Sequence, residues 1–226
     1  MNTKVDYVFC HPGNPSSAVQ SIRCEMIRAE LMGKGKSVGI THAASSNIYA
    51  VRNACLNKAG GYRKDQKPFE GTYDDYKFII WVDSDNMITL EQVERLISHD
   101  VDIVAGWYLQ QKQNGTPITS CGCWSGRQKD RHVIPESAIM TFPRNDKGLI
   151  EVDFAGFGLM VMKKGVLELI DYPWFRSWVF EWDEDGVPMA DMMTEDTGLL
   201  LRLKEKGFHV FVDPEVRIGH EKKMVI

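Results

Sequence analysis

The feature that most constrains the fold is an unbroken apolar run at residues 78–82, "FIIWV", which leads directly into "DSDN". A strand with one face in water alternates apolar and polar residues, whereas a strand covered on both faces is apolar at consecutive positions. We therefore predict a strand inside a parallel sheet, with helices packed on both faces of that sheet.

The segments around this run alternate between strand and helix patterns. Strands are predicted at "VDYVFC", "SVGITHA", "KFIIWV" and "VDIVAGWY", and the helices between them are expected to begin at Ser17, Ser46 and Thr89. Ser17 and Thr89 are each followed three residues later by a glutamine, which is the capping-box pattern. The buried face of the first helix is expected to consist of Val19, Ile22, Met26 and Leu31. This order predicts a doubly wound, mostly parallel α/β sheet.

The rest of the chain carries weaker signals. Residues 110–150 are rich in Gly, Pro, Ser, Thr and charge, and we interpret them as loops with a few short strands. Further on we expect a strand at "VDFAGFGLMVM", a short helix at "KKGVLELI", an aromatic surface segment at "YPWFRSWVFEWDEDG" and a last strand at "FHVFVD". Thr194 is expected to cap a helix with Leu199, Leu200 and Leu203 on its core face. Since no repeat or linker interrupts the chain, we predict a single domain over residues 1–226.

The composition excludes several classes of protein. The net charge is −4, with 27 basic and 31 acidic residues interspersed, so there is no basic stripe and nucleic-acid binding is not expected. Five cysteines do not make a disulfide framework, and the beginning "MNTKVDYVFC" is unlike a signal peptide. No apolar stretch approaches the roughly 18–20 residues of a membrane span, so we expect no transmembrane segment and a cytoplasmic location. The oligomeric state is not predicted.

The pair Asp83 and Asp85 is the first candidate site. Ligands of parallel sheets bind outside the carboxyl ends of the strands, which is where this pair falls. Two acids at i and i+2 can present oxygens to one hard cation, such as Mg²⁺ or Mn²⁺, with substrate phosphates completing its coordination. The alternative is that one acid caps the next helix and the other is solvated. A Ca²⁺ loop is disfavoured, because Met87 and Ile88 stand where an oxygen ligand and Gly belong.

Motifs further along the chain join this pair in an ordered set. "FAGFGLMVMKKGVLELI" is similar to a glycine-containing strand and helix, and "TEDTGLLLRLKEKGFHVFVDPEVRIGH" is similar to an acidic motif, helix, strand and terminal histidine. Together with "DSDN", they resemble the nucleotide-sugar-dependent glycosyltransferases of the GT-A fold, most closely glycosyltransferase family two and its relatives. The resemblance covers most of the chain, in order. It implies a single GT-A domain with a small acceptor-side subregion.

The resemblance implies a metal site. Asp85 corresponds to the metal ligand of the D-x-D motif, Asp83 is assigned to the nucleotide and the metal jointly, and Ser84 between them contacts the nucleotide. His220 is expected to be a further metal contact, reached from the far end of the chain. Since neutral imidazole suits Mn²⁺ better than Mg²⁺, manganese is the expected ion, with magnesium as the alternative. The implied donor is a nucleotide-diphosphate sugar, in the first place a UDP-sugar.

The resemblance also implies a general base. In those enzymes a carboxylate of a T-E-D triplet takes the proton of the acceptor hydroxyl. The corresponding residue in this sequence is Asp196. Glu195 is the alternative base. A purely structural interpretation stays open for either acid, because carboxylates are stabilised at the N-terminus of a helix.

The remaining nucleotide contacts are implied near the first strands. Arg52 lies in "AVRNA", which is similar to the R-N pair whose arginine faces the nucleotide, although a helical arginine can simply be solvated or ion-paired. His11, Pro12 and Asn14 follow the first strand, where the resembled family holds the base and ribose. The usual "P-x-Y-N" is "HPGN" here, and no clear acid follows the second strand. A base other than uracil therefore stays open.

Acceptor contacts are expected in the second half of the chain. Gly156 and Gly158 could let a sugar approach the backbone, although a β-bulge is an equal alternative. Trp182 is a candidate for stacking on a sugar ring, with core packing as the alternative. Residues 1–109 then form the nucleotide-binding half and residues 110–226 the acceptor-binding half.

The predicted function is that of a metal-dependent hexosyltransferase that transfers a sugar to a hydroxyl acceptor, such as a glycan, with inversion; a retaining outcome is not excluded. Two other functions are considered. A sugar nucleotidyltransferase needs a glycine-rich, basic loop after the first strand, which "HPGNPSSA" does not provide. A non-catalytic nucleotide- or glycan-binding module on the same fold is the other alternative, and turnover of a nucleotide sugar would distinguish it.

Overall fold

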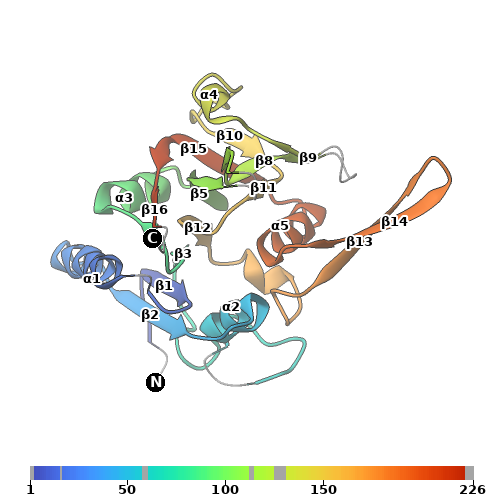
Figure 1. Ribbon diagram of the computed structural model, residues 1–226. Helices are drawn as coiled ribbons and strands as arrows, with labels where there is room; N and C mark the ends of the chain where they lie inside the picture. Colours follow the sequence, from blue (N-terminus) through green and yellow to red (C-terminus); the bar gives the residue numbers. More distant parts are fainter. Residues whose placement is uncertain (1–2, 16, 58–60, 112–114, 125–130, 222–226) are drawn as a thin grey trace.

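A seven-stranded sheet forms the centre of the protein. The computed structural model describes residues 3–15, 17–57, 61–111, 115–124 and 131–221. The strand order is β10-β15-β5-β12-β3-β1-β2 (Figure 1). Five strands run in one direction: β1 (Tyr7–Pro12), β2 (Val38–Ala43), β3 (Phe78–Trp81), β5 (Ile103–Trp107) and β15 (Val210–Arg217). β10 (Ile150–Val152) and β12 (Met160–Lys163) run in the opposite direction.

Helices cover both faces of this sheet. α1 (Ala18–Gly33) and α3 (Leu90–Ser98) contribute Ile27, Leu31, Val93 and Leu96 to one hydrophobic core. α2 (Ile48–Leu56) and α5 (Glu195–Glu205) contribute Cys55, Leu56, Leu199, Leu200 and Leu203 to a second core on the other face. The predicted doubly wound, mostly parallel α/β architecture is therefore confirmed.

The apolar run at residues 78–82 lies between the two cores. Ile79 and Trp81 belong to the core under α2 and α5, while Ile80 and Val82 belong to the core under α1 and α3. All four side chains are 0% exposed. Because β3 lies between β1 and β12, the chain leaves the middle of the sheet at Asp83.

The smaller elements gather at one end of the large sheet. β8 (Cys121–Trp124), β9 (Arg131–Val133) and β11 (Phe154–Ala155) form a three-stranded sheet, and β6 (Leu109–Gln111) pairs with β7 (Pro117–Thr119). β13 (Trp178–Glu184) and β14 (Val187–Met193) form a hairpin that extends away from the body (Figure 1). A short helix, α4 (Glu136–Ile139), completes this part, whereas a 3₁₀ turn at Leu167–Leu169 follows β12 at the opposite end of the sheet, where Glu168 accepts from Tyr76. No helix in the described residues is both long and apolar enough to cross a membrane.

Several local predictions need correction. Val19, Ile22 and Met26 are 57%, 59% and 58% exposed, and the buried face of α1 is Gln20, Cys24, Ile27 and Leu31. Both sets have helical spacing, so periodicity alone could not decide which one faces the sheet. The predicted helix "KKGVLELI" is only the 3₁₀ turn, and the aromatic segment contains a β-strand.

The helix caps agree more closely with the sequence. Thr89 and Gln92 form both hydrogen bonds of the capping box. Ser17 accepts from the Gln20 backbone, but the Gln20 side chain points inward and donates to Cys24 Sγ and to the Asp83 carbonyl. α2 is capped by Asn47, one residue after the expected Ser46.

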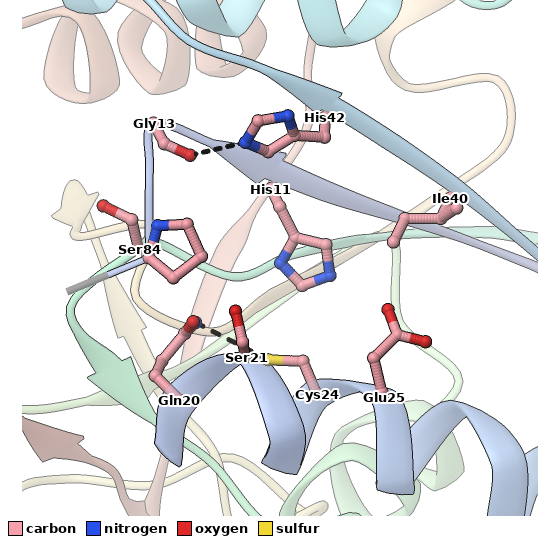
Figure 2. A pocket seen from close by; sticks show the side chains of 10 residues that line it. His11, Gly13, Gln20, Ser21, Cys24, Glu25, Ile40, His42 and Ser84 are labelled. Carbon is pink, nitrogen blue, oxygen red and sulfur yellow. Dashed lines mark hydrogen bonds between the residues drawn. The ribbon is translucent and has the colours of Figure 1, made fainter. Parts of the chain in front are cut away.

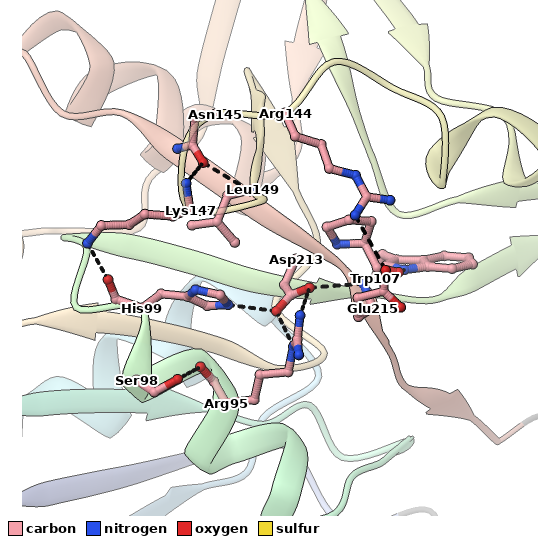
Figure 3. Close-up of polar contacts among 11 residues, drawn as sticks. Arg95, Ser98, His99, Trp107, Arg144, Asn145, Lys147, Leu149, Asp213 and Glu215 are labelled. Atoms are coloured by element: carbon pink, nitrogen blue, oxygen red, sulfur yellow. Dashed lines mark hydrogen bonds and ion pairs between the residues drawn. The ribbon is translucent and has the colours of Figure 1, made fainter.

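A buried ion-pair cluster attaches α3 to β15. Asp213 is 0% exposed and accepts from Arg95 Nε at 2.6 Å and from the Glu215 backbone at 2.9 Å, and its Oδ2 lies 2.7 Å from His99 Nε2 (Figure 3). Burial by itself would raise the pKa of Asp213, but the bonds from Arg95 and His99 outweigh it and hold the pKa below its usual value. The carboxylate therefore stays charged inside the protein, bound to both neighbouring side chains.

Candidate active site

The turn after β3 is joined to the far end of the chain. β16 (Gly219–His220) pairs antiparallel with β4 (Asn86–Met87), so His220 lies opposite Asn86. The Glu221 N–H donates to the Asp85 carbonyl at 2.7 Å, and Asn86 Nδ2 donates to the Gly219 carbonyl at 3.1 Å. A short backbone ladder thus holds the last described residues beside the aspartate pair.

This ladder brings Asp85 and His220 together. His220 Nε2 lies 2.9 Å from Asp85 Oδ2, and His220 Nδ1 lies 2.9 Å from the Leu109 carbonyl oxygen. A carbonyl oxygen can only accept, so Nδ1 carries a proton. A neutral ring then presents the Nε2 lone pair toward the carboxylate, whereas a protonated ring donates from Nε2 to Asp85. Two electron-pair donors at this distance need a proton or a cation between them. A backbone carbonyl that orients the second ring nitrogen is also the usual support of a metal-binding histidine.

Asp83 has a different partner. Arg52 Nη2 lies 3.0 Å from Asp83 Oδ1, and Arg52 Nε donates to Glu195 Oε1 at 3.1 Å. The guanidinium is 3% exposed and lies 4.7 Å from the centroid of the Phe157 ring. One buried arginine from α2 therefore holds the first acid of D-x-D and the first residue of α5. The predicted share of Asp83 in the metal site stays a prediction.

The pKa values of these three groups follow from burial and mutual attraction. Burial raises the pKa of Asp83 and of Glu195, and attraction by Arg52 only partly opposes the effect. For Arg52, burial would lower the pKa, but the carboxylates of Asp83 and Glu195 outweigh it and raise the pKa above its usual value. The arginine is therefore always charged, and two acids share its charge.

The predicted base candidates lie at the N-terminus of α5. Glu195 is 9% exposed and bound to Arg52, whereas Asp196 is half-buried and accepts from the Thr197 N–H at 2.7 Å. Tyr49 Oη donates to the Met193 carbonyl at 2.9 Å, which holds the chain leading into this turn. Of the two acids, Asp196 is the more accessible to an acceptor.

A cavity of about 190 Å³ lies beside the D-x-D turn, between α1 and the ends of β1 and β2 (Figure 2). His11, Gln20, Glu25 and Ser84 are among the side chains that line it. Burial is the main cause that lowers the pKa of His11 to about 4, so the ring is neutral at pH 7. Its Nε2 atom is buried and has no hydrogen-bond partner among the described residues. Such an atom can accept a hydrogen bond from a ligand.

The other predicted nucleotide contacts differ in accessibility. Pro12 is buried at the end of β1 and Asn14 is exposed in the loop that follows. Gly13, between them, has a φ of +88° and lies against Ser84, since a Cβ atom there would be 3.1 Å from Ser84 Oγ. The loop after β1 thus packs directly on the D-x-D turn.

The two glycines that follow β11, Gly156 and Gly158, have a packing role. A Cβ atom at Gly156 would collide with the Tyr108 ring, and a Cβ atom at Gly158 would lie 2.6 Å from Tyr108 Cε1 and 2.8 Å from Asn86 Cγ. Tyr108 in turn packs edge-on against His220, with ring centroids 5.0 Å apart. Because glycine has no Cβ atom, these two positions leave room for the Tyr108 ring, which packs against His220. The predicted contact of Gly156 and Gly158 with an acceptor stays a prediction.

Two residues of this region had no signal in the sequence. Tyr108 lies in a predicted strand and Phe157 in the glycine-containing motif, but no pattern singles out either ring, and only their contacts with His220 and Arg52 show their role. Trp182 lies on β13, within the extended hairpin, where it stacks on Phe180 with ring centroids 5.5 Å apart. It is separated from the Asp85 region in the fold. Its predicted sugar contact stays a prediction.

The sheet order and the acids that follow its central strand define the class of the fold, which is the predicted GT-A-like α/β fold. No protein-family model matches this chain, and no curated protein matches its sequence.

Two solved structures are similar to the chain in fold. A protein described as A197 from STIV has a TM-score of 0.51 and 16% identity, with 98% of this chain and 96% of that chain covered. A structure of GalNAc-T7 with UDP, GalNAc and Mn²⁺ has a TM-score of 0.49 and 10% identity, with 98% of this chain and 44% of that chain covered. At these identities the similarity concerns the fold alone.

Proposed function

We propose that the protein is a metal-dependent glycosyltransferase that transfers a sugar from a nucleotide-diphosphate sugar, in the first place a UDP-sugar, to a hydroxyl acceptor with inversion. The observation that carries this proposal is the convergence of Asp85 Oδ2 and His220 Nε2, 2.9 Å apart, with Nδ1 directed to the Leu109 carbonyl. The pair lies at the carboxyl edge of the sheet, where parallel α/β folds bind ligands.

The donor set fits a divalent ion that is shared with a substrate. No cluster of three His, Cys, Asp or Glu side chains suited to a metal occurs in the described part of the chain. Asp85 and His220 would supply two ligands, one oxygen and one nitrogen, and the diphosphate of the donor would supply others. The mixed set favours Mn²⁺ over Mg²⁺. When bound, the ion would stabilise the negative charge that develops on the leaving phosphate.

The cavity beside α1 supports a nucleoside site next to this pair. The cavity beside α1 contains His11 and Ser84, and Ser84 is also the residue between the two aspartates. A ligand that filled the cavity and reached Asp85 would have a ring at one end and charge at the other, as a nucleoside diphosphate does. We assign His11, Pro12, Asn14, Ser84 and Asp83 to this nucleotide, with Arg52 fixing Asp83.

Residues 110–226 would bind the acceptor, except that His220 from this half would bind the metal of the donor. Asp196 would take the proton of the attacking hydroxyl, because it is the accessible acid at the turn, while Glu195 is held by Arg52. Gly156, Gly158 and Trp182 are assigned to the acceptor.

Nucleotide binding tests the proposal. The full chain would be mixed with UDP-, GDP- and CMP-sugars, with Mn²⁺, Mg²⁺ or no metal, and its thermal unfolding followed. Ligand that binds only the folded protein at about 100 times its Kd adds about 2.7 kcal/mol of stability, so a raised Tm is expected with one base and with Mn²⁺. Asp85→Ala should lose this shift while keeping the Tm of the ligand-free protein.

Release of free nucleotide from the bound donor would then separate an enzyme from a binding module. A folded protein that binds no nucleotide sugar with any metal would refute the proposal. The pair does not cap the next helix, because α3 is capped by Thr89 with Gln92. Loss of folding in Asp85→Ala would instead show a structural role for Asp85, through its contact with His220.

A further inference from the structure

A second and larger cavity, of about 470 Å³, lies on the acceptor side of the protein. Its lining residues lie at the base of the β13–β14 hairpin, at the end of β8, on α5 and at Asp153. Figure 1 labels these helices and strands. Trp124, Trp178 and Phe180 supply its aromatic walls, and Asp153, Lys204 and Glu205 supply its charged side chains. Its volume is within the range of small-molecule sites in proteins.

The aromatic rings come from segments that are distant in sequence. Trp124 meets Phe180 edge-on with ring centroids 4.8 Å apart, and Phe180 stacks on Trp182 at 5.5 Å and 19°. Trp178, Phe180 and Trp182 alternate along β13, so they share one face, and each is half-buried. A row of aromatic rings therefore leads from the cavity along the hairpin, with part of each ring exposed.

The charged side chains are held in place at the other side of the cavity. Lys204 Nζ forms an ion pair with Asp153 Oδ1, and Asp153 Oδ2 accepts from the backbone N–H of Trp124 at 2.6 Å. An ammonium group has three N–H donors, and Asp153 takes one of them. Glu205 adds an exposed carboxylate one residue further along α5.

We propose that this cavity binds a pyranose ring of an oligosaccharide acceptor, away from the sugar that reacts. A pyranose has C–H faces that pack on aromatic rings and a rim of hydroxyls that bond to Lys204, Glu205 and Asp153. An alkyl chain would satisfy the aromatic walls but would desolvate the charged groups without replacing their hydrogen bonds, which is costly. The mixture of side chains therefore favours a sugar over a lipid.

The position of the cavity suits a chain-like ligand. Met193 lines the cavity and is three residues before Asp196, the proposed base. Lys204, which also lines the cavity, lies eight residues after Asp196 on the same helix, about 12 Å along its axis and about a quarter of a turn around it. A glycan with one hydroxyl at Asp196 would reach the cavity with a later ring. This inference rests on the proposed function, and it specifies the acceptor as an oligosaccharide.

A glycan array with the chain of residues 1–226 tests the proposal. The best-bound oligosaccharide would then be titrated into the protein, with tryptophan fluorescence as the readout. Binding of at least one oligosaccharide is expected, and Phe180→Ala should weaken it at least about tenfold, as truncation of a central aromatic contact does. Val179→Ala is the matched control, because Val179 is 53% exposed on the opposite face of the same strand. Trp124→Ala, checked for an unchanged Tm, gives a second truncation outside the hairpin.

The outcomes distinguish this proposal from the proposed function. If the array shows no binding, or if Phe180→Ala and Trp124→Ala bind the oligosaccharide as tightly as the natural protein, the cavity is not a glycan site. UDP and Mn²⁺ would be titrated into the same variants. If the variants still bind UDP but the oligosaccharide shows no dependence on the cavity, only the glycan site is refuted. If the oligosaccharide binds through Phe180 but the protein binds no nucleotide, the glycan site is supported and the proposed transferase activity is refuted.

Discussion

Arg52 and Glu195 are 143 residues apart in sequence, and the guanidinium Nε of the first donates to Oε1 of the second at 3.1 Å in the interior. The same guanidinium lies 3.0 Å from Asp83, at the end of the central strand. One cation thus sets the position of α5 relative to the D-x-D turn. The distance between the proposed base and the proposed donor site depends on this arginine.

Removal of this arginine should destabilise the protein. Arg52→Met would leave Asp83 and Glu195 buried without their partner, and breaking a buried ion pair in this way costs about 3–5 kcal/mol. The free energy of unfolding, measured by urea denaturation, should fall by about that amount. Arg63→Met is the control, because Arg63 forms only exposed ion pairs and its loss should cost less than about 1 kcal/mol.

Removal of the two acids should partly restore the stability of the Arg52→Met variant. In the triple variant that adds Asp83→Asn and Glu195→Gln to Arg52→Met, no charge is left unpaired at this place. Part of the lost stability should return. A triple variant that is less stable than Arg52→Met would show that the arginine acts through its aromatic contacts and not through the two acids.

Asp196→Asn should leave binding of the donor nearly intact while the rate of transfer falls by at least about a hundredfold, since removal of a general base commonly costs 10²–10⁴. The measurement is transfer rate under saturating donor, together with the Kd of the nucleotide sugar. Glu195→Gln is the comparison. If Glu195→Gln alone loses transfer while keeping the fold and donor affinity, the base has been assigned to the wrong acid.

His220→Ala should weaken Mn²⁺ affinity at least about tenfold, because even the residues that orient metal ligands contribute 10–100-fold. Isothermal titration of Mn²⁺ in the presence of UDP measures this effect. His209→Ala is a matched control, since His209 is exposed and paired with Glu151. Full Mn²⁺ affinity and turnover in His220→Ala would show that this histidine is not a ligand.

His11 should make the protein sensitive to mild acid. The folded state lowers the pKa of His11 from 6.5 to about 4, so between these values the unfolded chain binds a proton that the folded chain does not. The free energy of unfolding should therefore fall as the pH drops from 6.5 to 4. In His11→Asn, this decrease should be smaller than in the natural protein, as measured by denaturation at several pH values. An identical pH dependence in both proteins would contradict the prediction.

The contribution of Asp213 to the free energy of unfolding should change at a lower pH than the contribution of His11. Its pKa is lower in the folded protein than the usual value of 3.8, so the stability from its bonds to Arg95 and His99 is present above that value and is lost as the pH falls below it. Asp213→Asn should be less stable at pH 7, and its stability should decrease less below pH 3.8. A variant as stable as the natural protein at pH 7 would show that the cluster contributes nothing to folding.

Much of the fold was open to prediction because it depends on local patterns. The apolar run "FIIWV", the capping box at Thr89 and the alternation of strands and helices all act within a few residues, and each is found where it was expected. The position of Asp83 and Asp85 at the end of β3 followed from the same patterns. The buried face of α1 did not, because two stripes with the same period compete and only the sheet selects between them.

By itself, the sequence determined the class of the fold and the position of Asp83 and Asp85 after the central strand. Apolar strand runs and helix-capping patterns are made by residues that are close together in the sequence. Only the tertiary structure decided which side chains meet. Arg52 with Glu195 and Trp124 with Phe180 are joined across long separations by the packing of whole elements. His220 was expected beside Asp85 only from the resemblance to a family, and not from any spacing along the chain. Such contacts depend on the three-dimensional course of the backbone, which no local spacing along the chain specifies.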